Sequence, residues 1–356
     1  MITLFIVSPQ PYSGKSLLSL LLGMRFLEEG KRVGYIKPVG LSPVKVAGIC
    51  TDDDAVFINN YLDLKGPLDL ICPLPITSEL VNQIIQGKIK DLAKKVREAF
   101  DGLSVGRDIM LVGGAGSFAT GFILGLPSPR IAELLDAKVL LVIRYDSDLS
   151  VENIFFAREL FREHLIGTVI NSIPRDREEY VRKSVLPYIE STGVNVLGAI
   201  PSDETLNSVS VGELADYLGG QVLCCEDRLD ELCERFMIGA MNVESALRYF
   251  RKAANKAVIT GGDRPDIQLA ALETPTKCVI LSGNLYPTAV ILAKAQEVGV
   301  PMILVSEDTL SIVQRIESLL GKPKIKGEKK IQRGRELFMK NVDFERLCRV
   351  LGFQMK

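Results

Sequence analysis

The chain has 356 residues, of which 47% are hydrophobic, and its formal net charge is −1. This length favours two domains, and the near-neutral charge argues against bulk nucleic-acid binding. No apolar run reaches the roughly 18 residues that a membrane span needs, and no signal peptide precedes the first expected strand. We therefore expect a cytoplasmic protein that binds neither nucleic acid nor membranes.

Seven cysteines and one histidine restrict the metal and redox chemistry of the chain. The cysteines include no Cys-x-x-Cys pair, and His164 stands at the end of an expected helix without an evident nucleophile or carboxylate. Structural zinc and a disulfide framework are therefore not expected. We interpret the one cluster, Cys224, Cys225 and Cys233, as reduced thiols that are partly buried.

The N-terminal segment combines an expected strand, a loop and a helix start. An apolar run at residues 2–7 predicts a buried strand, and Gly14-Lys15-Ser16 opens an amphipathic segment at 17–29. Backbone N–H groups at such a junction point at a bound phosphate, Lys15 adds a positive charge, and the Ser16 hydroxyl is a ligand for Mg²⁺. We interpret residues 8–16 as a nucleotide phosphate-binding loop.

The beginning of this loop departs from the usual pattern. Ser8 or Pro9 stands where such loops usually start with glycine. Pro9 and Pro11 also have no N–H group to offer to a phosphate. The alternative interpretation is a vestigial loop that keeps the fold but binds nucleotide weakly.

Two further candidate groups follow the loop. Lys37 stands at the carboxyl end of an expected strand at 32–39, the edge where open α/β sheets bind ligands. It either contacts a phosphate or a carboxylate, or is a solvated lysine. Asp52, Asp53 and Asp54 precede an expected helix at 55–62. They either cap that helix or hold Mg²⁺ opposite Ser16, and both roles are compatible within the trio.

The remainder of the first two thirds alternates between expected helices and strands. A charged amphipathic helix is expected at 79–100, and a glycine-rich turn at 113–117 follows a strand. Alternation of this kind predicts a mostly parallel sheet with helices on both faces. The expected strands lie at 108–112, 138–143, 167–171 and 193–201, and the expected helices at 131–135, 151–163 and 211–218.

The last third predicts a linker at 223–237 and a smaller α/β domain. Strand–turn–helix patterns begin at residues 257, 278 and 300, which places their loops on one edge of a parallel sheet. The loop Gly261, Gly262, Asp263 and Arg264 lies on that edge, with Arg264 as a clamp for a small anion or nucleotide. The alternative is ordinary turn chemistry and helix capping.

A basic stretch and a final helix at 344–351 end the chain. We interpret the basic stretch as a solvated surface segment, because no aromatic residues interleave its charges. It consists of Lys322, Lys324, Lys326, Lys329, Lys330, Arg333 and Arg335.

Several segments together resemble known families. Residues 8–16, 35–39, 51–54, 112–116 and 169–174 occur in the order seen in dethiobiotin synthetase-like P-loop proteins. Residues 239–241, 260–264 and 308–309 resemble the DRTGG domain. This combination is most similar to the N-terminal half of long phosphotransacetylases, without the acetyltransferase domain. It implies a P-loop domain at 1–222, a DRTGG-type domain at 238–340 and a C-terminal helix at 341–356.

The resemblance also implies ATP and Mg²⁺ as cofactors and assigns roles to residues. Lys15 and Lys37 act on the phosphates or on an acid substrate, and Asn171 reads the purine edge. The full cofactor-binding set is Ser13, Gly14, Lys15, Ser16, Leu17, Asn171 and Pro201, and the metal ligands are Ser16 with Asp53 or Asp54.

Departures from the family pattern shape the expected function. Gly113 stands where dethiobiotin synthetase has a glutamate that helps to hold Mg²⁺, which weakens the case for phosphoryl transfer. With His164 as the one histidine, a glutaminase has no base. We therefore expect a nucleotide-binding regulatory or ligand-sensing protein, a homo-oligomer with an acyltransferase or other protein partner. The alternatives are a free-standing ATP-dependent carboxylate-activating enzyme, related to dethiobiotin or cobyrinic acid synthetases, and a scaffold with a vestigial loop.

Overall fold

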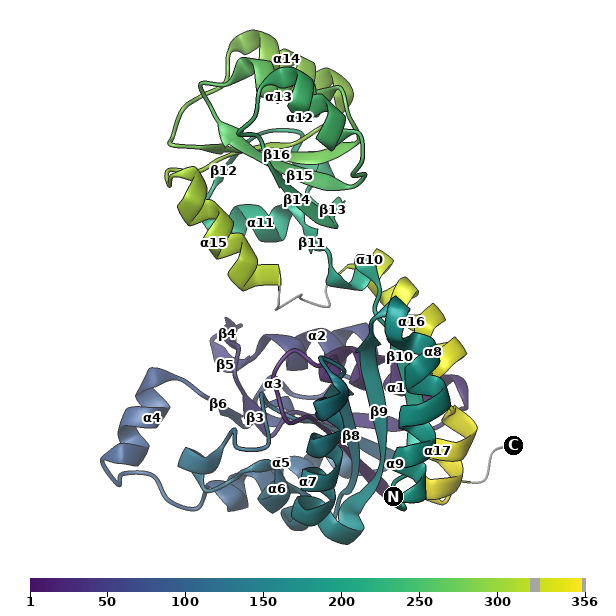
Figure 1. Cartoon of the computed structure of the whole chain (residues 1–356). Coiled ribbons are helices and arrows are strands. Elements are labelled where there is room, and N and C mark those ends of the chain that lie inside the picture. Colours follow the sequence, from purple (N-terminus) through teal and green to yellow (C-terminus); the bar gives the residue numbers. More distant parts are fainter. Residues whose placement is uncertain (321–326, 354–356) are drawn as a thin grey trace. The chain divides into compact units, whose positions relative to one another are not determined.

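The computed structural model describes residues 1–320 and 327–353 (Figure 1). The chain divides into two compact units. The first unit comprises residues 1–202 and 331–356, and the second comprises residues 203–330. The chain therefore leaves the first unit after Ser202 and returns to it at Ile331.

A parallel sheet forms the centre of the first unit. Its strands lie in the order β10-β9-β8-β1-β7-β2, and all neighbouring pairs are parallel. The strands are β1 (Ile2–Val7), β2 (Val33–Ile36), β7 (Ile109–Gly113), β8 (Lys138–Arg144), β9 (Leu165–Ile173) and β10 (Val196–Pro201). The chain runs from β1 to β2 at one edge, returns to β7, and then passes β1 to reach β8, β9 and β10 on its other side. The winding direction therefore reverses beside β1, and ligands bind at such a switch point in open α/β sheets.

Helices cover both faces of this sheet (Figure 1). Right-handed crossovers place α1 on one face and α6, α7 and α9 on the other. The helices are α1 (Lys15–Glu28), α2 (Asp53–Tyr61), α3 (Leu68–Ile71), α4 (Ser78–Ile85), α5 (Leu92–Ser104), α6 (Ser128–Leu134), α7 (Glu152–Phe161), α8 (Glu178–Tyr180), α9 (Leu186–Ser191), α16 (Glu328–Asn341) and α17 (Phe344–Leu351). The predicted P-loop-type parallel sheet with helices on both faces is thus confirmed.

Two short sheets extend the first unit, and they differ from the sequence-based expectation. β3 (Val39–Gly40) pairs in parallel with β6 (Leu74–Pro75), and β4 (Pro43–Val46) pairs antiparallel with β5 (Ile49–Asp52). The strand expected at 32–39 ends at Ile36, because Pro38 has no N–H to continue a ladder. The chain resumes after Pro38 as β3 in a different sheet.

The single helix expected at 79–100 is in fact two helices, α4 and α5. Gly87 and Asp91, between them, have φ values of 68° and 63°. These left-handed conformations end a right-handed helix. The break separates α4 from the rest of the amphipathic pattern and leaves Ile85 exposed at the end of α4.

The second unit contains a sheet with the order β12-β17-β16-β15-β14. Its β14, β15, β16 and β17 are parallel, and β12 adds an antiparallel edge. The strands are β12 (Gln221–Cys224), β14 (Arg235–Ile238), β15 (Lys256–Gly261), β16 (Thr276–Ser282) and β17 (Met302–Leu304), while β11 (Val209–Ser210) pairs with β13 (Leu232–Cys233). The helices are α10 (Glu204–Asn207), α11 (Val211–Leu218), α12 (Val243–Phe250), α13 (Pro265–Leu272), α14 (Ala289–Val298) and α15 (Thr309–Leu320). The predicted smaller α/β unit is confirmed.

The observed division lies earlier in the chain than the expected boundary at residue 222. Helix α11 buries Val211, Leu214 and Leu218 in a core cluster of the second unit. The segment 223–237, expected to be a linker, contains β13 and most of β14. Charged residues interrupt the apolar pattern of these short strands, so their sequence does not look like that of buried strands.

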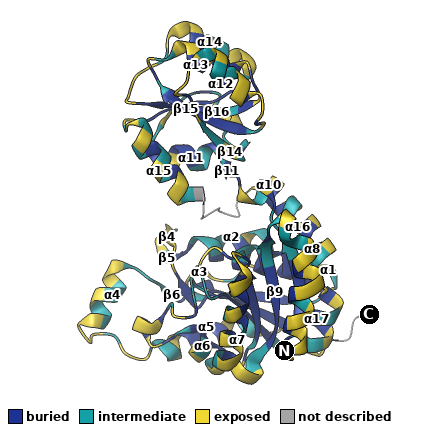
Figure 2. Ribbon diagram, viewed as in Figure 1, coloured by how far each residue is buried: buried dark blue, intermediate teal, exposed yellow. Residues whose placement is uncertain are grey.

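Each unit has its own hydrophobic interior. Figure 2 shows buried strands enclosed by helices whose outer faces are exposed. In the described part of the chain, no helix combines the length and the apolar character that crossing a membrane requires.

The basic stretch is only partly as expected. Lys329, Lys330, Arg333 and Arg335 lie on α16, and the Lys330 side chain is 2% exposed instead of solvated. Its ammonium lies 3.8 Å from Glu213. Helix periodicity therefore turns one lysine of the stretch inward. Lys322, Lys324 and Lys326 lie outside the described residues.

Candidate nucleotide-binding site

A loop at residues 8–14 connects β1 to α1, and Gly14 closes it. Gly14 has φ 95° and ψ 8°, a left-handed conformation that glycine adopts without strain. A Cβ at this position would also lie 2.4 Å from the Asn171 Nδ2 atom. Both the backbone angle and the close approach therefore require glycine at the start of α1.

Ser8 compensates for the absence of the usual first glycine of the loop. Its buried hydroxyl lies 2.7 Å from the Ser13 Oγ and 2.8 Å from the Gln10 carbonyl oxygen. The Ser13 hydroxyl donates to the same carbonyl over 3.0 Å. Side-chain hydrogen bonds thus hold the loop closed where the two prolines provide no N–H.

The start of α1 presents unpaired backbone donors. Among the described residues, no acceptor pairs with the N–H groups of Gly14, Lys15 and Ser16. The first N–H groups of a helix have no partner within it, and they carry the positive end of its dipole. This is the arrangement that binds a phosphate at a helix N-terminus.

Lys15 is a buried cation beside these donors. Its side-chain nitrogen donates to the carbonyl oxygens of Gly116, at 2.7 Å, and Gln10, at 3.2 Å. Burial, assisted by repulsion from Lys37, lowers the pKa of Lys15 to about 8. In the described chain no carboxylate lies within 4 Å of this nitrogen. The Lys15 side chain therefore points to the glycine-rich turn after β7, and the hydrogen bonds that hold it there are to uncharged carbonyl oxygens.

Lys37 lies between two aspartates. Its Nζ is 2.7 Å from Asp52 Oδ1 and 3.0 Å from Asp54 Oδ2. Burial by itself lowers the pKa of Lys37, but Asp54 and Asp52 outweigh it and raise the pKa overall. The Lys37 ammonium therefore stays charged, and the predicted placement at a ligand-binding strand edge brings it next to the loop residues.

The three aspartates have different contacts, and only the capping role is observed. Asp52 is fully buried and caps α2, accepting N–H bonds from Asp54 at 3.1 Å and Ala55 at 3.2 Å. Asp54 instead accepts a hydrogen bond from the Ser16 hydroxyl over 3.0 Å. Asp53 is the first residue of α2. The pair Ser16 and Asp54 therefore forms the oxygen donor set that suits Mg²⁺.

Tyr35 fills the space beside Gly113. A Cβ on Gly113 would lie 2.3 Å from the Tyr35 hydroxyl oxygen. Burial, together with the charges of Asp54 and Asp52, raises the pKa of Tyr35 well above its usual value, so the phenol is neutral. Where the resemblance places a metal-binding glutamate, this chain has a glycine whose side-chain space the Tyr35 phenol occupies.

The other residues predicted to bind the cofactor are Asn171, Leu17 and Pro201, and only Asn171 hydrogen-bonds to the loop. Asn171, near the end of β9, donates its side-chain N–H to the Ser13 carbonyl oxygen over 2.9 Å. Its amide group thus supports the loop directly. The Leu17 side chain faces α16, since a Cβ on Gly334 would lie 3.0 Å from Leu17 Cδ2. Pro201 ends the edge strand β10.

Sequence reasoning missed several participants in this site. Gln10 and Gly116 act through their carbonyl groups, which no side-chain pattern reveals. Tyr35 lies within the strand motif that carries Lys37, so its spacing from Lys37 is a signal that could have suggested it. Asp52 was part of the recognised trio, but its pairing with Lys37 depends on the fold.

The donor set alone is too small to hold a metal ion firmly. In the part of the chain that the structure describes, no group of three or more histidine, cysteine, aspartate or glutamate side chains could hold a metal. Mg²⁺ in nucleotide sites takes one or two protein oxygens and completes its shell with phosphates and water. Ser16 and Asp54 fit that kind of site.

The predicted ligand loop of the second unit is largely engaged in internal contacts. Arg264 pairs with Asp266 over 3.0 Å and donates to the Met241 carbonyl over 3.2 Å. Gln268, which is fully buried, donates to the carbonyls of Gly261 at 2.8 Å and Gly262 at 3.0 Å. Turn chemistry and capping account for these contacts, and an anion held at Gly261–Arg264 stays a prediction.

Comparison with known proteins agrees with this organisation. Residues 2–210 match the AAA domain family, and residues 213–319 match the DRTGG domain. The chain belongs to the AAA domain family. The predicted combination of a dethiobiotin synthetase-like P-loop domain with a DRTGG domain is confirmed.

Individual relatives of this AAA domain protein are distant. It is 24% identical over 368 residues to phosphate acetyltransferase of Nitratidesulfovibrio vulgaris, covering 97% of this chain and 51% of the relative. It is 25% identical over 195 residues to ATP-dependent dethiobiotin synthetase BioD of Methanococcus vannielii, covering 53% and 84%. The MinD cell division protein of Aquifex aeolicus is similar with a TM-score of 0.35 and 15% identity, over 58% of this chain and 84% of that one. The chain spans about half the length of the phosphate acetyltransferases that it matches.

Proposed function

We propose that the AAA domain unit binds ATP with Mg²⁺ and that the protein is a nucleotide-dependent regulatory or ligand-sensing protein. The observation that carries this proposal is the convergence of Lys15, the unpaired N–H groups of residues 14–16 and the Ser16–Asp54 pair at one helix start. A polyanion supplies the acceptors and the negative charge that these groups lack.

The residues have distinct roles in this proposal. Lys15 and the N–H groups of Gly14 and Ser16 bind the phosphate oxygens. Ser16 and Asp54 hold the Mg²⁺ ion, which neutralises charge on the phosphates when bound. Lys37 balances the buried Asp52 and keeps Asp54 oriented toward Ser16. Asn171 supports the loop beside the nucleotide.

The sensing role rests on the domain combination. The phosphate acetyltransferase of Nitratidesulfovibrio vulgaris aligns with 97% of this chain, and the alignment covers 51% of that relative. We therefore propose that the nucleotide state is passed to a protein partner, such as an acyltransferase, and that the protein acts as a homo-oligomer. The loop at Gly261–Arg264 is the proposed ligand contact of the second unit.

Isothermal titration of the full chain with ATP and Mg²⁺ tests the core of this proposal. We expect saturable binding that weakens at least tenfold in Lys15→Ala, which removes a charge from the phosphates. Lys45→Ala is the matched control, because Lys45 is an exposed lysine of β4. Asp54→Asn should weaken binding only when Mg²⁺ is present. Absence of binding by the intact chain, or equal effects of the two lysine variants, contradicts the proposal.

A second candidate function is ATP-dependent activation of a carboxylate. The observation that favours it is the second ammonium, Lys37, 3.0 Å from the same Asp54 oxygen that accepts from Ser16. Its signature is ADP release stimulated by a small carboxylic acid and lost in Lys15→Ala. If no member of a carboxylic acid panel raises ADP release above the basal rate, this function is excluded and the regulatory one is retained.

A further inference from the structure

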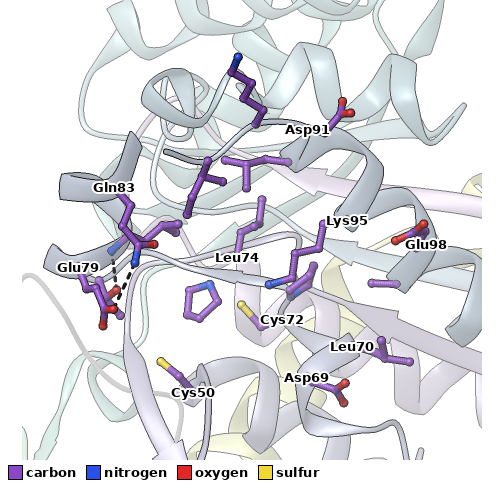
Figure 3. A pocket seen from close by; sticks show the side chains of 18 residues that line it. Cys50, Asp69, Leu70, Cys72, Leu74, Glu79, Gln83, Asp91, Lys95 and Glu98 are labelled. Carbon is purple, nitrogen blue, oxygen red and sulfur yellow. Dashed lines mark hydrogen bonds between the residues drawn. The ribbon is translucent and has the colours of Figure 1, made fainter. Parts of the chain in front are cut away.

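A cavity of about 740 Å³ lies in the first unit, and none of the loop residues 8–16 lines it. Its walls come from β5, the segment from α3 to β6, α4 and the beginning of α5 (Figure 3). This volume is within the range of small-molecule binding sites, roughly 300–1,000 Å³. The break between α4 and α5, which the sequence pattern did not predict, creates the space.

The lining is mainly apolar. Leu70, Leu74, Leu80 and Leu92 come from different elements and face the same cavity. A ligand with an apolar body would remove this surface from water, which contributes about 25 cal/mol per Å² of apolar area. The lining therefore favours a ligand with a hydrocarbon or aromatic part.

Two lysines, Lys90 and Lys95, and four carboxylates, Asp69, Glu79, Asp91 and Glu98, line the cavity. Figure 3 shows the Lys95 side chain extending inward, whereas the carboxylates of Asp69 and Glu98 point away from the centre. Glu98 lies 3.9 Å from Lys94, the neighbour of Lys95 on α5. In the described chain Lys95 has no carboxylate within 4 Å. An anionic group on the ligand would supply that missing partner.

The cysteine at the floor of the cavity is unsuited to covalent chemistry. Cys72 is buried, and burial, followed by the charge of Asp52, raises the pKa of its thiol far above the usual value. The thiolate is the nucleophilic form, and it is not populated under such conditions. Cys72 is therefore not suited to covalent attachment of a ligand.

The cavity floor is connected directly to the buried ion pair of the nucleotide site. The Lys37 N–H donates to the Ile71 carbonyl over 2.8 Å, and the Ile76 N–H donates to the Gly40 carbonyl over 2.8 Å. On another wall, Cys50 lies on β5, which ends at Asp52. The segment that accepts a hydrogen bond from the Lys37 backbone and the strand that ends at Asp52 thus each contribute residues to the cavity wall.

We propose that this cavity binds a small organic acid with an apolar body, its carboxylate at Lys95 and its apolar part against the four leucines. Binding displaces the floor segment 71–76 and the β5 wall, and so shifts the Lys37–Asp52 pair. The cavity site stands independently of nucleotide binding, whereas its effect on the nucleotide site rests on the function proposed above.

Octanoate, an eight-carbon monocarboxylate, is a suitable probe for calorimetric titration into the full chain. We expect saturable binding that weakens at least tenfold in Lys95→Ala and at least tenfold for the neutral amide octanamide. Lys94→Ala is the matched control, because Lys94 is the adjacent lysine on α5 and does not line the cavity. Both lysines are exposed, so neither variant should unfold the protein. Absence of octanoate binding, or equal losses in the two variants, overturns the proposal.

A second titration separates this inference from the proposed function. With octanoate saturating, the Kd for ATP and Mg²⁺ should change at least threefold, and ATP should change the octanoate Kd by the same factor, since coupling is reciprocal. If octanoate binds and ATP does not, the proposed function fails and the cavity assignment stands. If both bind with unchanged affinities, the coupling is overturned.

Discussion

At the scale of single residues, the environment of Lys15 disfavours the protonated form of its side chain. The residue is 7% exposed, its ammonium donates to two carbonyl oxygens, and Lys37 repels it. These conditions lower its pKa to about 8. A bound phosphate reverses them by adding negative charge beside the ammonium. Nucleotide binding should therefore raise the pKa of Lys15.

This reasoning predicts a pH dependence of ATP affinity. Below pH 8 Lys15 is protonated in both the free and the bound protein, and the affinity is constant with respect to this group. Above pH 8 the free protein loses a proton that the complex retains, so the affinity falls by up to about tenfold per pH unit. Calorimetry from pH 7 to pH 9.5, in two buffers of different ionisation enthalpy, measures both the slope and the proton uptake.

Lys15→Met provides the control for this profile. Its affinity should be weak and should not fall above pH 8. A wild-type affinity that is constant between pH 8 and pH 9.5 would show that Lys15 does not contact the nucleotide phosphates.

At the scale of elements, the pairing of β2 with β7 decides which side chain fills the space beside Gly113. The two strands pair in parallel, with Tyr35 opposite Leu111 and Ile36 opposite Val112. Tyr35 is 3% exposed, and its hydroxyl takes the space of a Cβ on Gly113. The phenol and the glycine are therefore complementary, and a larger residue at 113 requires a change at 35.

Gly113→Ala should lower the free energy of unfolding by about 1–3 kcal/mol, because it overpacks a buried strand. Tyr35→Phe should relieve part of this loss, since the nearest remaining atom, Cζ, lies 3.0 Å from the added Cβ. Urea unfolding of the two single variants and the double variant measures the coupling.

Gly102→Ala is the comparison for this series. It lies in helix α5, where the added Cβ meets Leu70 Cδ1 at 3.4 Å, and a helical glycine is less favourable than alanine by roughly 0.5–1 kcal/mol. It should be neutral or stabilising. A loss at Gly102 as large as that at Gly113 would contradict the assigned cause.

At the scale of the whole molecule, the end of the chain completes the first unit. Helix α17 buries Leu347 and Cys348 in the same core as β1 and α1. The Phe26 ring of α1 lies 5.0 Å from the Phe344 ring and 5.7 Å from the Phe353 ring. The first unit therefore depends on residues that follow the second unit in the sequence.

Leu347→Ala should destabilise the first unit by about 2–5 kcal/mol, because it leaves a cavity in that core. Met339→Ala on α16 is the matched control, since Met339 is 55% exposed and should change stability by less than about 0.5 kcal/mol. Hydrogen exchange of the full chain locates the effect. Loss of protection confined to residues 203–320 would contradict this placement.

Much of the architecture could be predicted because it is encoded locally. Apolar runs and glycine turns separated by helical patterns indicated the parallel sheet, and Gly14-Lys15-Ser16 indicated where its helix begins. The expected strand at 32–39 and the linker at 223–237 differ from the structure, because Pro38 interrupts one and charged residues disguise the strands of the other.

The sequence by itself determined the phosphate loop, the order of the two units and the presence of an aspartate trio at a helix start. Only the tertiary structure decided that Asp54 faces Ser16 while Asp52 is buried, that Tyr35 excludes a side chain at Gly113, and that α17 belongs to the first core. The physical reason is the range of the interactions. A strand, a turn or a helix start is specified by residues a few positions apart, whereas a buried ion pair or a shared core depends on which distant segments the folded chain brings into contact.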